Sequence, residues 1–388
     1  MGSMTDFYPQ GLKVKQVQVI HRHGERTPVK STFSKYFQFD WNLCFNVDKH
    51  THSLLAHSES NSNEHSAEHP SHESKPINFK VKWEHSNERP KELLGACYFG
   101  QLTDIGRKNL MSFGRRLNEL YVRKLGFLPE KCDPSLMYLR STNYARTFES
   151  VQSLFLGMYP NCHENVVLNA RQEYDETLHA SRSCEAYRTT MKDFRSKQAK
   201  VNRTKVPSNL EFLFEESNES PTVHKVFDIL ASAQGNEYPL PLGVQDKDVA
   251  DLGKLVAEEW YGAYKYDHIK RLGIGRFVGE MSDRIKNHKN ERERFFVYSG
   301  HDVTIGPLLQ AFGVCDGQWP KFGANIIFEV VQKDNKDFVR MKYNEEFQQI
   351  PQCPQSEIKA CPIETFMKIC EKLIPKDYEA ECNRVHNE

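Results

Sequence analysis

The repeated order of a strand-type run, a polar turn and a helix-type run is the feature that most restricts how this chain can fold. Lys13–Ile20 alternates polar and β-branched residues, and a turn with Gly24 follows it. Ser135–Arg140 and Arg294–Gly300 are further strand-type runs, each followed by a helix-type run. Two more runs on either side of 332–336 indicate a β-hairpin. Strands that alternate with helices are typical of an α/β sheet covered on both faces.

Capping residues mark where the first expected helices begin. Thr103 can cap a helix that runs to about Lys124. Ser141 or Thr142 can cap a second helix, which ends before Pro160. The length of 388 residues suits roughly two or three domains, and a single large α/β unit is the alternative.

Two regions interrupt the strand and helix pattern. Glu173–Tyr238 has mixed charge and weak periodicity, and we expect it to be an insertion that packs over the edge of the sheet. His50–His85 is polar and holds seven of the sixteen histidines. Because these histidines show no regular ligand spacing, we expect a solvated and mobile insertion. A metal-binding tract is the alternative.

Charge and hydropathy exclude some partners. Lys plus Arg and Asp plus Glu both number 52, so any attraction for anions must be local. We therefore expect no nucleic acid partner. No run of about 20 apolar residues is present to span a bilayer.

The first residues bear on where the protein acts. They lack the apolar region of a signal peptide, which favours the cytoplasm or a mitochondrion. Met-Gly-Ser before a second Met resembles a cloning remnant, so secretion after loss of a leader is the alternative.

The ten cysteines include no Cys-x-x-Cys pair. Their spacing argues against a zinc ribbon or a thioredoxin-like redox site. Cys353 and Cys361 can form a bridge. Reduced thiols in a reducing compartment are the alternative, and the sequence does not choose between them.

The string Arg22-His23-Gly24-x-Arg26 follows the first expected strand. Side chains at the carboxyl end of a strand lie where open α/β folds bind ligands. Two guanidinium groups can hold a phosphate, and a neutral imidazole between them can attack phosphorus. A surface loop whose arginines pair with carboxylates is the alternative, but so long a motif favours a phosphate site.

Two further segments suit the same chemistry. Arg146 lies near the start of an expected helix, where anions are favoured, although an ordinary exposed arginine is the alternative. His301 and Asp302 follow the strand Arg294–Gly300, although such a pair can also cap a helix. If the three segments meet, we expect His23 to take a phosphoryl group and Asp302 to protonate the departing alkoxide.

These motifs resemble those of the histidine acid phosphatases. Arg22–Pro28, RHGERTP, is similar to the first signature of the family, and the His301-Asp302 pair is similar to its second. Arg140–Ser150, RSTNYARTFES, is similar to the segment that supplies a further phosphate-binding arginine.

The resemblance implies a fold and a domain arrangement. It implies an α/β fold with a three-layer α/β/α core and a mixed sheet, as in phosphoglycerate mutases, plus a smaller, mainly helical cap. Residues 11–45, 98–172 and 239–388 would form the core, and residues 46–97 and 173–238 would be insertions that form the cap.

The resemblance also implies chemical roles. His23 would be the phosphorylated nucleophile and Asp302 the proton donor. The implied phosphate-binding residues are Arg22, Arg26, Arg146 and His301. No metal and no organic cofactor are implied, and the partner would be a small phosphate monoester. Blocks such as GQWPKFGANIIFEV are similar to a branch that acts on lysophosphatidate, so a lysophospholipid is one expected substrate.

Three alternatives stay open at this point: a phytase-like enzyme, a sugar-phosphate phosphatase, and a catalytically silent protein that binds phosphate esters. A zero net charge argues against the strongly basic pocket of a phytase. The presence of both His23 and Asp302 argues against a silent protein. An aromatic run could line a lipid channel, with core packing as its alternative; its members are Phe33, Tyr36, Phe37, Phe39 and Trp41.

Overall fold

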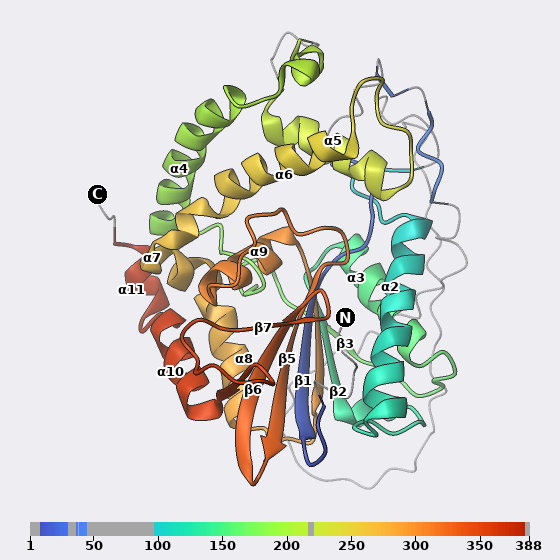
Figure 1. The fold of residues 1–388 in the computed structure, drawn as a ribbon, viewed down its shortest axis with the longest axis vertical. Helices are drawn as coiled ribbons and strands as arrows, with labels where there is room; N and C mark the ends of the chain where they lie inside the picture. Colours follow the sequence, from blue (N-terminus) through green and yellow to red (C-terminus); the bar gives the residue numbers. More distant parts are fainter. Residues whose placement is uncertain (1–7, 30–35, 38, 45–96, 216–220, 385–388) are drawn as a thin grey trace, which may run out of the picture.

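The sheet is built around β1 (Lys13–Arg22), which lies at its centre (Figure 1). The computed structural model describes residues 8–29, 36–37, 39–44, 97–215 and 221–384. The strand order is β3 (Leu168–Ala170), β2 (Met137–Ser141), β4 (Phe295–Gly300), β1, β5 (Asn325–Lys333), β6 (Lys336–Tyr343) and β7 (Glu346–Gln348), with β8 (Ala360–Pro362) paired to β6. The three pairs β1–β4, β2–β4 and β2–β3 are parallel, and the other pairs are antiparallel. The expected mixed sheet is therefore confirmed.

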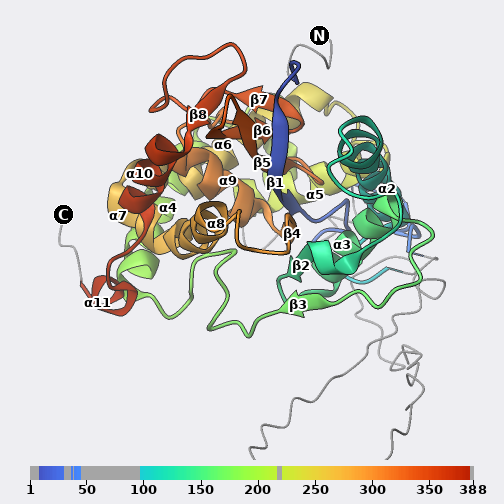
Figure 2. The same cartoon turned by 90° about the horizontal axis from the view of Figure 1, so that it is seen from below.

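Helices cover both faces of the sheet (Figure 2). One face carries α2 (Asp104–Leu117) and α3 (Ala145–Met158), and the other carries α8 (Arg276–Lys286), α9 (Asp302–Ala311) and α10 (Ile363–Leu373). Side chains alternate along β4, so that Phe295 and Val297 pack with α2 and α3 while Phe296 and Tyr298 pack with α8 and α9. The three-layer α/β arrangement expected from the sequence is therefore confirmed.

The polar positions of β1 are buried as well as the apolar ones. Gln16 and Gln18 are each 1% exposed. Their amides donate to backbone carbonyls of α8, at Arg284 (2.8 Å) and Met281 (3.0 Å). These bonds satisfy the buried amides, so a strand that reads as half polar can lie between two helical layers.

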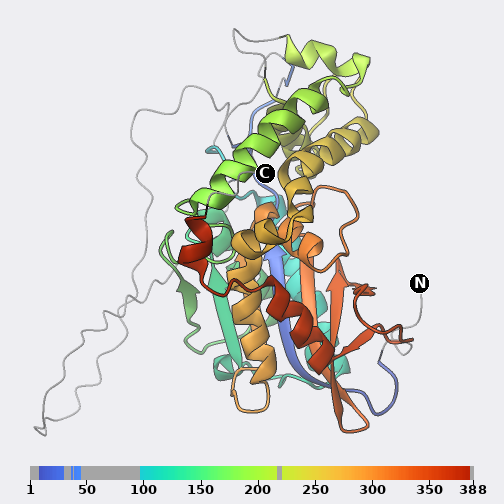
Figure 3. The same ribbon diagram turned by 90° about the vertical axis from the view of Figure 1, so that its left-hand side faces the viewer.

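A further group of helices lies across the carboxyl ends of the parallel strands (Figures 1 and 3). α4 (Glu185–Arg203), α5 (Val223–Gly235) and α6 (Asp246–Tyr261) pack on one another there. α6 packs with this group, although it lies inside the segment 239–388 that the sequence assigned to the core. The domain boundaries stay a prediction. The remaining helical segments are η2 (Asn118–Lys124), η3 (Pro134–Leu136), η4 (Ser208–Phe214), η5 (Gly262–Lys265), α7 (Asp267–Lys270), η6 (Arg271–Gly275) and α11 (Tyr378–Cys382).

One predicted helix start is right and another is wrong. The Thr103 hydroxyl accepts a hydrogen bond from the Gly106 amide, so it caps α2 as expected. Neither Ser141 nor Thr142 caps α3. Ser141 ends β2, and the Thr142 hydroxyl bonds to other side chains, so α3 begins only after Tyr144.

Eight of the ten cysteines form disulfides. The pairs are Cys44–Cys97, Cys132–Cys162, Cys184–Cys382 and Cys353–Cys361. The bridge between Cys353 and Cys361 is the one that the sequence suggested, and reduced thiols are wrong for these eight. Cys315 and Cys370 are unpaired.

Some sequence expectations fall beyond this description. The histidine-rich segment His50–His85 and Phe33 lie outside the described residues. Within the described residues, no helix has the length and apolar character needed to cross a bilayer.

Candidate active site

The three predicted segments meet at the carboxyl ends of β1, β2 and β4. Arg22 at the end of β1 lies opposite Gly300 at the end of β4, and Ser141 of β2 pairs with Ser299 of β4. Beyond these ends the segments line one cavity of about 630 Å³. The six predicted site residues that line it are Arg22, His23, Arg26, Arg146, His301 and Asp302.

His23 is held by its own backbone neighbourhood. Its Nδ1 atom lies 2.8 Å from the carbonyl oxygen of Gly24, which fits a ring that donates from Nδ1 and carries its lone pair on Nε2. The residue is 1% exposed. Burial lowers the pKa of His23 well below its usual value, and the charges of Arg146 and Arg22 lower it further. The ring is therefore neutral at pH values where a free histidine is charged.

Arg22 links the His23 segment to the Asp302 segment. Its guanidinium lies 2.8 Å from Asp302 Oδ2 and donates a second bond of 2.6 Å to the Pro320 carbonyl. It also lies 4.2 Å from the ring centroid of Phe322. Asp302 begins α9, and its Oδ1 atom accepts the Val303 amide. These contacts fix the carboxyl group beside the cavity.

Arg26 connects the site to the helices above it. Its guanidinium lies 2.7 Å from Asp228 Oδ1, and Asp228 Oδ2 accepts the Val29 amide at 2.9 Å. Burial by itself favours a protonated Asp228, but the Arg26 charge outweighs it and the pKa of Asp228 is lowered. A carboxylate of α5 therefore holds the loop that follows His23.

Arg146 and His301 line the same cavity. Arg146 lies over the ring of Tyr144, 4.7 Å from its centroid. Burial, followed by the charge of Arg26, lowers the pKa of Arg146 to about 10, so it stays charged at neutral pH. His301 Nε2 lies 2.9 Å from the Thr142 hydroxyl, and burial followed by the Arg146 charge lowers the pKa of His301 well below its usual value.

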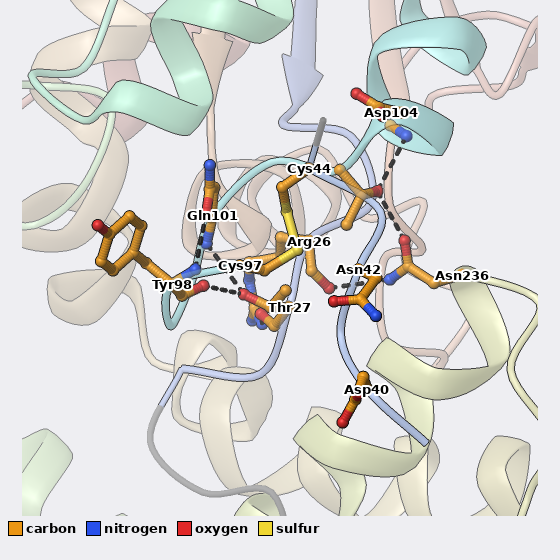
Figure 4. The surroundings of a disulfide bond; sticks show 12 residues. Arg26, Thr27, Asp40, Asn42, Cys44, Cys97, Tyr98, Gln101, Asp104 and Asn236 are labelled. Carbon is orange, nitrogen blue, oxygen red and sulfur yellow. Dashed lines mark hydrogen bonds between the residues drawn. A yellow bond between two sulfur atoms is a disulfide. The ribbon is translucent and has the colours of Figure 1, made fainter. Parts of the chain in front are cut away.

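The loop next to Arg26 is fixed from the other side by a disulfide (Figure 4). Cys97 is bridged to Cys44, and the hydroxyl of Thr27 donates to the Tyr98 carbonyl. The Asn236 amide donates to the Arg26 carbonyl at 3.0 Å. Arg26 is thus held by segments from three distant parts of the chain.

Several lining residues were not predicted from the sequence. His179 lies 6.4 Å from His301 between ring centroids, and it comes from the region read as an insertion. The cavity also has a local excess of positive charge that the zero net charge does not show. Six arginine and lysine side chains and two carboxylates line it. The unpredicted charged or imidazole members are His179, Arg182, Arg195, His224, Lys225 and Asp228.

The aromatic run after the first motif does not line this cavity. Phe37 and Trp41 are buried in a core with α5 and α6, and Tyr36 and Phe39 pack against the same core. The lipid-channel expectation is therefore wrong for these four, and the core-packing alternative is right. The aromatic residues that line the cavity come from other segments: Tyr144, Tyr187, Phe227, Trp260, Trp319 and Phe322.

Comparison with known proteins identifies the family. The model described as histidine phosphatase superfamily (branch 2) matches residues 13–344. A probable acid phosphatase of Schizosaccharomyces pombe is 28% identical over 350 residues, which cover 84% of this chain and 74% of that protein. Lysophosphatidic acid phosphatase type 6 of Homo sapiens is 25% identical over 392 residues, which cover 96% of this chain and 87% of the human protein. The apo form of Hafnia alvei phytase has a TM-score of 0.65 at 13% identity and covers 96% of this chain and 99% of the phytase.

The chain therefore belongs to branch 2 of the histidine phosphatase superfamily. Its likeness to the phytase shows that the two share a fold. Within that branch it is a histidine acid phosphatase, an enzyme that hydrolyses phosphate monoesters. The alternative of a catalytically silent binding protein is set aside.

Proposed function

We propose that hydrolysis proceeds in two steps through a phosphohistidine at His23. The observation that carries this proposal is the state of the His23 ring. Its Nδ1 atom is engaged by the Gly24 carbonyl, and burial with the neighbouring guanidinium groups keeps the ring neutral. Nε2 is then the atom available for attack on a phosphorus atom held in the cavity.

The two steps divide the work between His23 and Asp302. In the first, the Nε2–P bond forms, the ester P–O bond breaks, and Asp302 gives its proton to the departing oxygen. In the second, Asp302 takes a proton from the attacking water, the Nε2–P bond breaks, and phosphate leaves. The phosphoryl oxygens are held by Arg22, Arg26, Arg146 and His301.

The first prediction tests the nucleophile. We expect His23→Ala to lose turnover of an aryl phosphate and to form no labelled enzyme with a radiolabelled phosphate ester. Wild-type enzyme quenched in alkali should carry the label, because phosphohistidine is stable there and is lost in acid. His163→Ala, at an exposed histidine, is the matched control. Labelling that persists in His23→Ala would place the covalent step on another residue.

The substrate is proposed at two levels. A phosphate monoester suits the family, and the name of the human relative suggests lysophosphatidate. Phe227 and Trp319 offer the cavity an apolar wall for a leaving group. The phytase-like alternative is supported by the positive charge of the same cavity. A panel of kcat/KM values for lysophosphatidate, inositol phosphates, sugar phosphates and phosphotyrosine would rank them.

A further inference from the structure

The three helices above the sheet also supply side chains to the lining of the cavity. α4 supplies Arg195, α5 supplies His224 and α6 supplies Trp260. The Arg195 guanidinium lies 3.9 Å from the ring centroid of Trp260, and the His224 ring lies 4.7 Å from it. These three side chains form one contiguous group, which we call the cap triad.

The cap triad contains hydrogen-bond donors that the protein does not use. Among the described residues, neither Arg195 Nε nor Trp260 Nε1 has an acceptor, although both atoms are buried. No carboxylate in the described part of the chain forms an ion pair with Arg195. A buried donor without an acceptor is unfavourable, so an anionic acceptor that enters the cavity would be bound here.

Aromatic side chains line the cavity both beside His23 and beside the cap triad. Phe322 lies next to His23, with 5.8 Å between ring centroids. Trp319 lies 6.0 Å from Trp260 and 5.7 Å from Phe227, again between centroids. Such a wall favours a flat or apolar group between the two charged ends.

We propose that the cap triad is a second anion subsite, which binds a carboxylate or a second phosphate on the leaving group of the substrate. The substrate class is then a phosphate monoester whose ring-sized apolar spacer carries a second anionic group. This inference rests on the proposed function, because it places the reacting phosphate at His23. Lysophosphatidate has no anionic group besides its phosphate, so Arg195 would not strengthen its binding.

A matched pair of substrates tests the subsite. 4-Carboxyphenyl phosphate and 4-carbamoylphenyl phosphate have the same shape and differ in one charge. Wild-type enzyme should prefer the carboxylate about tenfold or more in kcat/KM, through KM, because a charge-assisted bond is stronger than a neutral one. Hydroquinone bisphosphate, compared with phenyl phosphate, shows whether a phosphate is preferred in the same way.

Two variants connect the preference to the cap triad. Arg195→Met keeps the apolar stem, and we expect its carboxylate preference to fall to near one. Trp260→Phe keeps an aromatic ring but removes Nε1–H, and we expect a loss of a few fold in the same ratio. Arg188→Met, an exposed arginine of the same helix outside the cavity, should keep the full preference.

The possible failures are distinguishable. Equal kcat/KM for the carboxylate and the amide, or a preference that survives both Arg195→Met and Trp260→Phe, would overturn the subsite and leave the phosphatase intact. If wild-type enzyme hydrolysed neither ester and took no label, the chemistry at His23 would fall and the subsite with it.

Discussion

His23 is surrounded by positive charge, and this has a direct consequence for the pH range of the enzyme. Burial and then the charges of Arg146, Arg22 and Arg26 lower the pKa of its imidazole. A base whose pKa is lowered stays neutral as the pH falls below its ordinary value near 6.5. On the acidic side of the pH profile, the fall in activity caused by protonation of His23 should therefore begin only at low pH.

The second prediction concerns that acidic limb. Arg146→Gln removes the charge that, after burial, lowers the pKa of His23 most, so the pKa of the imidazole should rise. The acidic limb of kcat/KM, which reports the free enzyme, should then move to higher pH. The measurement is a pH profile of both enzymes with one aryl phosphate, so that the titration of the substrate cancels. Arg115→Gln, at an exposed site, is the control, and a limb that does not move would mean that Arg146 does not set the His23 pKa.

The third prediction concerns the proton donor. Asp302→Asn should lose about 10²–10⁴-fold in kcat with glycerol phosphate, whose alkoxide needs a proton. The loss should be much smaller with 4-nitrophenyl phosphate, which leaves without one. Asp193→Asn, an exposed carboxylate of α4, is the matched control. Equal losses on both substrates would indicate that Asp302 only positions Arg22.

The six proposed site residues could be predicted because each lies at the end of a strand, just beyond one, or at the start of the helix that follows it. Their partners could not. Asp228 holds Arg26 across 202 residues of sequence, and His179 comes from a segment without clear periodicity. A single sequence carries no local signal for contacts over such separations, so the cap side of the cavity was found only from the structure.

At the scale of elements, α2 and α3 approach each other closely where each carries a glycine. A Cβ atom on Gly114 would lie 1.9 Å from the Leu154 carbonyl oxygen, and one on Gly157 would lie 2.0 Å from the Met111 carbonyl oxygen. The periodicity of the sequence predicted both helices, but it did not predict that their backbones touch. The start of α3 was also misplaced, because Thr142 bonds to His301 of another segment.

The fourth prediction tests this contact. Gly114→Ala should lower the free energy of unfolding by about 1–3 kcal/mol, because the new methyl group forces two backbones apart. Gly279→Ala in α8 is the matched control, since its Cβ would meet only ordinary contacts, the nearest at 3.7 Å. That control should gain roughly 0.5–1 kcal/mol from its better helix propensity. Thermal or denaturant unfolding of both variants measures the difference, and a Gly114→Ala protein as stable as Gly279→Ala would contradict the close approach.

At the scale of the molecule, disulfides join elements that are far apart in sequence. Cys184 precedes α4 and Cys382 ends α11, with a sequence separation of 198, and the two helices lie side by side (Figure 3). Four bridges are typical of proteins that mature in an oxidising compartment. They therefore argue for an oxidising compartment and against the cytoplasm that the sequence favoured.

The fifth prediction tests the bridge between Cys184 and Cys382. The double change Cys184→Ser and Cys382→Ser should lower the free energy of unfolding by about 2–5 kcal/mol, because the unfolded chain regains its freedom. Cys315→Ser, at an unpaired cysteine, should have little effect. Thermal unfolding with and without reductant measures both effects. A double variant that unfolds at the same temperature as the wild type would show that the bridge adds no stability.

The bridge between Cys44 and Cys97 joins the two residues that flank the segment 45–96. The Cα atoms of these residues are 5.5 Å apart although 53 positions separate them. The stretch from 45 to 96 therefore departs and returns at nearly one point, beside the loop that carries Arg26. If the backbone were cut within that stretch, the two fragments would stay joined through sulfur. A longer or shorter stretch between the two cysteines would likewise leave the Arg26 guanidinium in place.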